Sequence, residues 1–120
     1  MIDLVNKARA RAGLSPLKAD MTLVSLARGK AQDMITLKYF GHISPTYGSP
    51  FDMMKAAGVT YRYAGENLAG AGNVDQAFNS LMNSSGHRAN ILNRDYTDIG
   101  GGAVQGSQYG IIFVQLFVGR

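Results

Sequence analysis

The sequence of 120 residues contains no cysteine, only two histidines and a single glutamate among its eight acidic residues. The absence of cysteine excludes disulfide bonds, thiolate metal sites and a cysteine nucleophile. A membrane-spanning helix needs about 20 apolar residues. The longest apolar run, "YGIIFVQLFVG", is shorter and contains Gln115. We therefore predict no transmembrane segment. The charged, amphipathic N-terminus also does not match a signal peptide.

Proline is scarce, with three residues against fifteen glycines. A hydrophobic content of 46% with 17% charged residues fits one globular domain over residues 1–120. The glycines gather after residue 65 and in "IGGGAVQG", which predicts irregular connections and strand bends in a second half that is not all helical.

The net charge is +4, but the basic residues are spread through predicted helices rather than gathered in one stripe. We interpret them as solvated helix faces and predict no nucleic-acid partner, because no aromatic residues alternate with them. The residues in question are Lys7, Arg9, Arg11, Lys18, Arg28, Lys30, Lys38 and Lys55.

Start and stop signals predict four helices in the first 86 residues. The first covers residues 2–12 and ends at Gly13, and the second begins at Asp20 and ends before Gly41. Ser49 caps the third, with Pro50 in its first turn and Asp52 completing a capping box, and Gly58 ends it. The fourth begins at the cap Asn73 and ends at Gly86, which would place His87 just beyond a helix.

The last third has the pattern of a β-hairpin, in which "TDIGGGAVQG" and "YGIIFVQLFVG" are joined by a short glycine-containing connection. Residues 111–114 are apolar without alternation, so this strand must be covered on both faces. A further strand is expected at "VTYRYAGE", with Glu66 at its end. The predicted fold class is α+β, a three-layer α-β-α sandwich with a small antiparallel sheet.

The scarce residues His42, Glu66 and His87 each directly follow a glycine. Two imidazoles and one carboxylate are a common set for zinc or another divalent ion. Their spacing matches no compact metal signature such as a helical H-E-x-x-H, so three unrelated polar residues in loops remain an alternative. We expect Gly65 and Gly86 to be structural requirements, with alanine costing about 1 kcal/mol or more wherever positive φ is needed.

Other polar residues near these three are weaker candidates. Ser44, Ser84 and Ser85 lie near the histidines, but no G-x-S-x-G nucleophile elbow is present. Asn67 and Asn90 are expected to bond local backbone, as asparagine usually does in tight turns.

Taken together, "YFGHISP", "YAGENLAG" and "SSGHRANIL" resemble the CAP superfamily of cysteine-rich secretory proteins, antigen 5 and plant pathogenesis-related proteins. The resemblance extends over nearly the whole chain and is closest to the compact bacterial branch with an SCP-like domain. It implies a central cleft that gathers two histidines and two acids, often with a bound divalent metal. By this resemblance the cleft residues are His42, Glu66 and His87.

The sequence departs from the family pattern at the second acid. Family members that have it carry the acid late in the helix before the second histidine, where this chain offers only Asn79, Asn83, Ser84 and Ser85. Acid–base chemistry would therefore rest on Glu66 alone. Eukaryotic relatives are typically rich in disulfides, so the lack of cysteine supports the bacterial branch of the family. It also supports an extracellular or cell-surface location, with any export signal outside these residues.

The resemblance leaves three functions open. The preferred hypothesis is a monomeric binding module, without committed catalysis, that holds zinc or magnesium weakly through His42 and His87 and binds a peptide, glycan or lipid. The first alternative is a metal-dependent hydrolase of peptide or cell-wall substrates with Glu66 as its catalytic base. The second is a purely structural surface domain.

Overall fold

The computed structural model describes residues 1–120, which form five helices and four strands. The helices are α1 (Ile2–Arg11), α2 (Met21–Thr36), α3 (Pro50–Ala56), α4 (Val74–Met82) and α5 (Ser85–Ile91). The strands are β1 (Lys18–Ala19), β2 (Tyr63–Ala71), β3 (Asp98–Ser107) and β4 (Gly110–Gly119). None of the helices is both long and apolar enough to cross a membrane.

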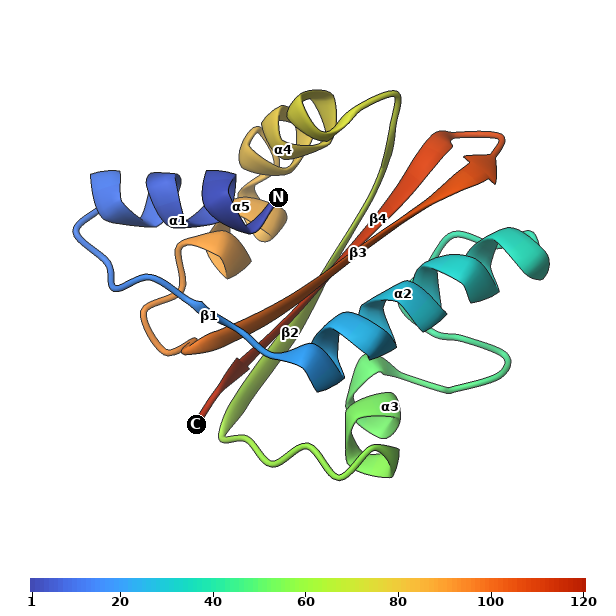
Figure 1. Ribbon diagram of the computed structural model, residues 1–120, viewed down its shortest axis with the longest axis horizontal. Helices are drawn as coiled ribbons and strands as arrows, with labels where there is room; N and C mark the ends of the chain where they lie inside the picture. The colour runs from blue at the N-terminus through green and yellow to red at the C-terminus, as the bar shows by residue number, and fades with distance from the viewer.

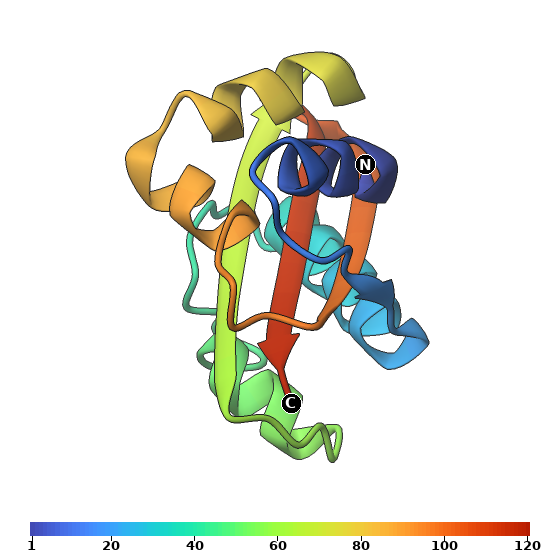
Figure 2. The ribbon, with the colours of Figure 1, turned by 90° about the vertical axis from the view of Figure 1, so that its left-hand side faces the viewer.

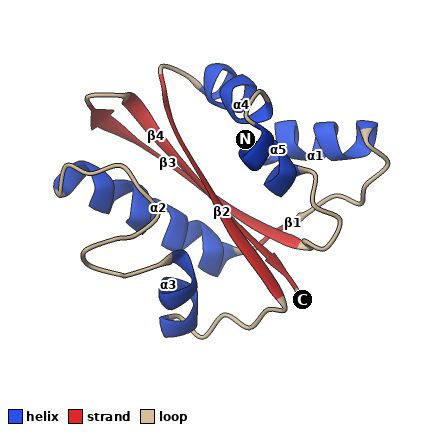
Figure 3. Ribbon diagram, turned by 180° about the vertical axis from the view of Figure 1, so that it is seen from behind, coloured by secondary structure: helices blue, strands red, loops and turns tan.

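The four strands form one sheet in the order β1-β3-β4-β2, which leaves β2 at one edge. The short β1 pairs with β3 in parallel, whereas β3, β4 and β2 pair antiparallel. Helices α2 and α3 cover one face of the sheet, and α1, α4 and α5 cover the other (Figures 1 and 3). The predicted α-β-α sandwich is therefore confirmed, and residues 112–119 of β4 are buried on both faces as expected.

The side chains predicted to cap the N-termini of three helices do so in the structure. Asp20 Oδ1 accepts a hydrogen bond from the backbone N–H of Leu23 at 3.0 Å. Ser49 and Asp52 form the expected capping box, with Pro50 in the first turn of α3. Asn73 caps α4 in the same way. These local signals set the order and spacing of the helices around the sheet.

Helix α2 packs very close to β3 because two glycines of "IGGGA" carry no side chain there. A Cβ at Gly100 would meet the backbone of Leu23, and one at Gly102 would meet the backbone of Ala27 at 2.6 Å. The prediction that these glycines mark irregular connections was wrong for them, since they lie in regular strand. It holds for Gly106, whose φ of 107° lies in a shift of register within β3.

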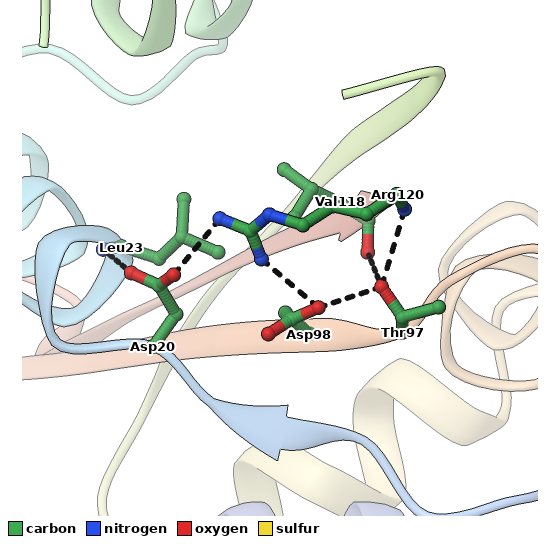
Figure 4. A network of polar contacts seen from close by, with 6 residues as sticks. All are labelled: Asp20, Leu23, Thr97, Asp98, Val118 and Arg120. Carbon is green, nitrogen blue, oxygen red and sulfur yellow. Dashed lines mark hydrogen bonds and ion pairs between the residues drawn. The ribbon is translucent and has the colours of Figure 1, made fainter. Parts of the chain in front are cut away.

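The C-terminal residue is tied to the start of α2 by a polar network (Figure 4). The guanidinium of Arg120 pairs with Asp20 and with Asp98, each at 2.9 Å. The backbone N–H of Arg120 donates to the hydroxyl of Thr97, which itself donates to Asp98 at 2.6 Å. This network joins the end of β4 and the start of α2 to the start of β3 in one cluster at the surface.

Two predictions about local position were wrong. Helix α4 ends at Met82, and Gly86 lies inside the separate helix α5, without a positive φ and with open space where a Cβ would be. His87 is thus the third residue of a helix rather than a residue beyond one. Strand β2 begins at Tyr63 and continues to Ala71, so Glu66 lies within the strand and not at its end.

Two of the basic residues expected on solvated helix faces are buried. Arg9 and Lys30 are each 1% exposed. The guanidinium of Arg9 donates to the backbone carbonyls of Ser15, Ile91 and Asn93 at 2.8–2.9 Å. Arg9 therefore holds α1 to the end of α5 and to the loop that leads to β3.

Candidate functional site

Glu66 and His42 form a hydrogen-bonded pair on the α2 side of the sheet. Glu66 projects from β2, and its side chain is fully buried, whereas the His42 side chain, on the loop between α2 and α3, is 54% exposed. Nδ1 of His42 lies 2.8 Å from Oε1 of Glu66. A contact through Nδ1 leaves the other ring nitrogen, Nε2, without a protein partner. The carboxylate thus fixes the orientation of an imidazole that faces solvent.

The loop that carries His42 is held by two residues of α2 that lie about one helical turn apart. The buried ammonium of Lys30 donates to the backbone carbonyl of His42 at 2.6 Å. The carboxylate of Asp33 accepts hydrogen bonds from the hydroxyls of Tyr39, Ser44 and Thr46, at 2.6, 2.7 and 2.8 Å. The sequence does not distinguish these two residues, because a helical lysine and aspartate also fit an ordinary solvated face.

Burial shapes the ionisation of this cluster. Desolvation raises the pKa of Glu66, and the hydrogen bond from His42 and the charge of Lys30 act in the opposite direction. Burial lowers the pKa of Lys30, which the charges of Glu66 and Asp33 oppose. Burial and the hydrogen bond to Asp33 raise the pKa of Tyr39 to about 12. Oε2 of Glu66 is buried without a hydrogen-bond partner, so part of this carboxylate is unsatisfied by the protein.

His87 makes its hydrogen bonds with residues other than His42 and Glu66. Its Nδ1 is 2.8 Å from the hydroxyl of Ser84, and its backbone carbonyl accepts from the side-chain amide of Asn67 at 3.0 Å. Consecutive strand residues point to opposite faces of a sheet, so Glu66 and Asn67 contact the two helical layers separately. No hydrogen bond joins His87 to His42 or Glu66. Of the two histidines, only His42 therefore contacts the Glu66 carboxylate.

The two asparagines belong to a buried network that continues across the sheet. Asn67 donates to Gln115 Oε1 at 3.1 Å, and Asn90 donates to Asn67 Oδ1 at 2.8 Å and to the backbone carbonyl of Glu66 at 3.3 Å. The hydroxyl of Tyr96 donates to Asn90 at 3.3 Å. The role is structural as predicted, but its partners are distant in sequence, so the prediction of local backbone bonding was wrong.

Gly65 is required by this network. A Cβ there would clash with the Tyr96 hydroxyl and approach Asn90 Oδ1 to 3.1 Å. The reason is close approach of side chains, since Gly65 does not have a positive φ. The glycine of "AGEN" thus allows α5 and its following loop to pack against β2 beside Glu66.

The available side chains fit a divalent metal only weakly. The structure contains no group of three or more His, Asp or Glu side chains close enough to hold a metal ion. Each histidine uses Nδ1 in its hydrogen bond, so the ring nitrogens free of a protein partner are Nε2 of His42 and Nε2 of His87. A carboxylate that hydrogen-bonds the other nitrogen of a ligating histidine is a common supporting arrangement, and Glu66 stands in that relation to His42.

The serines near the histidines do not form a nucleophile site. Ser44 is buried, donates to Asp33 and accepts from the backbone N–H groups of Thr46 and Tyr47. Ser84 contacts His87, but no acid orients that imidazole, as a serine–histidine–acid triad requires. Side-chain chemistry in this region therefore depends on the two imidazoles and on the buried carboxylate.

A model of the CAP family, described as the cysteine-rich secretory protein family, matches residues 2–117. The chain belongs to this family. The uncharacterised protein YkwD of Bacillus subtilis (strain 168) is 49% identical over 121 residues, which cover all of this chain and 46% of YkwD. The uncharacterised membrane protein YlbC of the same strain is 39% identical over 104 residues, 85% of this chain and 30% of YlbC. This CAP domain therefore spans less than half of either relative.

Solved structures give the same family. An extracellular protein of Bacillus anthracis str. Ames containing an SCP domain aligns with 99% of this chain at 33% identity and a TM-score of 0.88, and the match covers 39% of that protein. An outer surface protein of Borrelia burgdorferi aligns with 99% of this chain and 89% of its own length, with a TM-score of 0.90. Its identity of 24% shows likeness of fold alone.

Proposed function

We propose that this CAP domain is a binding module of an exported or cell-surface bacterial protein, and that its site is formed by His42, Glu66 and His87 at the edge strand β2. The observation that carries this proposal is the His42–Glu66 pair, in which a fully buried carboxylate holds a half-exposed imidazole. Burying a carboxylate is unfavourable, and an oriented ligand-binding imidazole is a functional reason to retain it.

The same geometry favours binding over catalysis. A general base must come within hydrogen-bond reach of the proton that it removes, and the Glu66 side chain is fully buried behind His42. The turn before His87 supplies only the hydroxyl of Ser84 to that imidazole. Hydrolysis with Glu66 as the base is therefore the weaker alternative, because Glu66 contacts the solvent side only through His42.

A divalent metal, if bound, would be held by Nε2 of His42 and Nε2 of His87. Imidazole ligands suit zinc better than magnesium, which prefers oxygen ligands, so we propose zinc. Two protein ligands leave other coordination positions to water or to an oxygen of a peptide, glycan or lipid ligand. The metal would supply positive charge for such an oxygen, while Glu66 keeps the His42 ring in place.

Extracellular location is supported by the relatives. The Bacillus anthracis protein that shares 33% identity with this chain is described as extracellular. We infer that the present domain is also exposed outside the cell, as one part of a longer protein. Surface accessibility of the domain on intact cells, probed with a specific antibody, tests this inference.

Isothermal titration calorimetry with zinc chloride near neutral pH tests the proposed site. We expect weak, reversible binding that is lost in His42→Ala and in His87→Ala and is weakened in Glu66→Gln. Gln105→Ala, at an exposed position of β3 away from β2, is the control and should leave binding unchanged. Absence of zinc binding, or equal binding in both histidine variants, would contradict the metal assignment.

The catalytic alternative is separated by incubation with peptides and cell-wall fragments, with and without a chelator. The binding proposal expects no turnover. Selective cleavage that disappears with the chelator, in His42→Ala and in Glu66→Gln would overturn it in favour of a hydrolase.

A further inference from the structure

The outer edge of β3 is open along most of its length. β1 pairs with β3 only at Asp98 and Ile99, and the last bond runs from the N–H of Asp20 to the carbonyl of Ile99 at 3.0 Å. Backbone groups alternate in direction along a strand, so those of Gly101 and Ala103 point to the same side as those of Ile99. With β1 ending at Ala19, no strand lies there to pair with them. An unpaired strand edge is a template for an added strand.

A cavity of about 420 Å³ lies along this open edge. One wall is the N-terminal ends of α1 and α4, and the other is one stripe of α2; Figure 2 shows α1 and α2 on opposite sides of β3. The cavity is mostly apolar, and the methionine that begins α2 is 72% exposed. Its main side chains are Met1, Ile2, Met21, Val24, Arg28 and Val74.

One buried side chain in this cavity has an unused hydrogen-bond donor. Gln115 is 1% exposed and lines the cavity, and its Oε1 accepts from Asn67. Its Nε2 has no partner. Gly101, directly opposite on β3, has no side chain, and nothing lies within 4 Å of where its Cβ would be. A buried donor left unpaired is destabilising, and a ligand carbonyl at this point would supply the missing hydrogen bond.

The charge of the cavity defines the partner further. Arg28 is the only charged residue among the lining residues, and it takes part in none of the ion pairs of the protein. An acidic group on the partner is therefore complementary to it. Because α1 and α2 lie on the two sides of this edge, we expect a single extended chain to reach it more readily than a second folded copy.

We propose that this groove binds an extended peptide segment of another protein, which adds to β3 beside Gly101 and Ala103. Main-chain hydrogen bonds to these two residues supply affinity, as in other cases of strand addition. Alternate apolar side chains of the peptide contact the α1 and α2 walls, and one acidic side chain pairs with Arg28. The site is separate from His42 and His87, on the opposite edge of the sheet from β2.

Selection of phage-displayed random dodecapeptides on the folded domain tests this proposal, followed by affinity measurement of a selected peptide by fluorescence polarisation. We expect recovered sequences that alternate apolar residues and contain Asp or Glu. Ala103→Pro should weaken binding about tenfold or more, because proline removes the outward N–H but is tolerated at a strand edge. Gly101→Val, which fills the space beside Gln115, is a second variant if the first fails to fold.

Charge reversal gives the matched control. Arg28→Glu should lose the acidic peptide and bind the same peptide with lysine in place of its acid, whereas Lys55→Glu on α3 should change neither affinity. Selected peptides that bind Ala103→Pro and Gly101→Val as well as the wild type would overturn the proposal. Concentration-dependent self-association that Ala103→Pro abolishes would also overturn it, because a second copy would then occupy the edge.

Discussion

At the scale of single residues, the isolated glutamate is a buried carboxylate that is only partly hydrogen-bonded. Glu66 is buried, one of its oxygens contacts His42, and the other has no protein partner. Such a group is difficult to explain as a stabilising residue, because burial raises its pKa and disfavours its charged form. Its chemical use is to orient the His42 ring, which has solvent on its other side.

The stability of a Glu66→Gln variant should report this burial through its pH dependence. The pKa of Glu66 is raised on folding. The contribution of Glu66 to the free energy of unfolding is therefore complete below its unfolded pKa near 4.5 and is lost as pH rises through its folded pKa. Glutamine does not titrate. Relative to wild type, the free energy of unfolding of Glu66→Gln in urea titrations should therefore increase as pH rises above the unfolded pKa of glutamate.

Asp52→Asn is a control with the opposite sign. In the wild type, the Asp52 carboxylate accepts a hydrogen bond from the backbone N–H of Ser49, which lowers the pKa of Asp52. The carboxylate therefore stabilises the protein above the unfolded pKa of aspartate. That contribution is lost as pH falls through the folded pKa. If both variants changed with pH in the same direction, the assignment of a raised pKa to Glu66 would be wrong.

Arg9 is the residue whose replacement we expect to be most destabilising. It is buried without an acidic partner and donates to several carbonyls of the loops around α5. Arg9→Met leaves these carbonyls unpaired and should lower the free energy of unfolding by about 3 kcal/mol or more. The exposed neighbour Arg11→Met should change it by no more than about 0.5 kcal/mol. Equal effects in chemical denaturation would refute this role.

At the scale of elements, the packing of α2 on β3 depends on alternate glycines of one strand. Gly100→Ala and Gly102→Ala should each cost about 1–3 kcal/mol, since a Cβ at either position meets helix backbone that cannot move independently. Gly101→Ala is the matched control, with open space at its Cβ, and should be near neutral. Thermal denaturation of the three variants checks this pattern. A similar cost at all three positions would favour a backbone effect over packing.

The elements themselves were largely predictable because their signals are local. Asp20, Ser49 and Asn73 cap helices at the predicted places, and the final hairpin was evident from its apolar strand and glycine turn. The helix containing His87 was missed, because Gly86 was interpreted as a stop although it lies in a first turn. A glycine has the same appearance in sequence whether it ends a helix or lies within one.

At the scale of the whole molecule, the family and layer order were predictable, but the assembly of the site was not. Three ordered motifs were enough to indicate the CAP fold. The burial of Arg9 and Lys30, and the contact of His87 with Asn67, depend on contacts between segments far apart in sequence. Helical periodicity predicts that Lys30 lies on the protein surface. It is buried because the loop that carries His42 covers it, and the sequence does not show where that loop lies.

The central claim is that buried Glu66 orients the His42 ring and leaves Nε2 available to a ligand. Long-range ¹H–¹⁵N correlation spectra of the imidazole nitrogens near neutral pH test this most directly. We predict that His42 carries its proton on Nδ1, that Nε2 is unprotonated and shifts when zinc chloride is added, and that Glu66→Gln alters this distribution. A proton on Nε2 of His42 in the wild type, unchanged by Glu66→Gln and by zinc, would contradict the account.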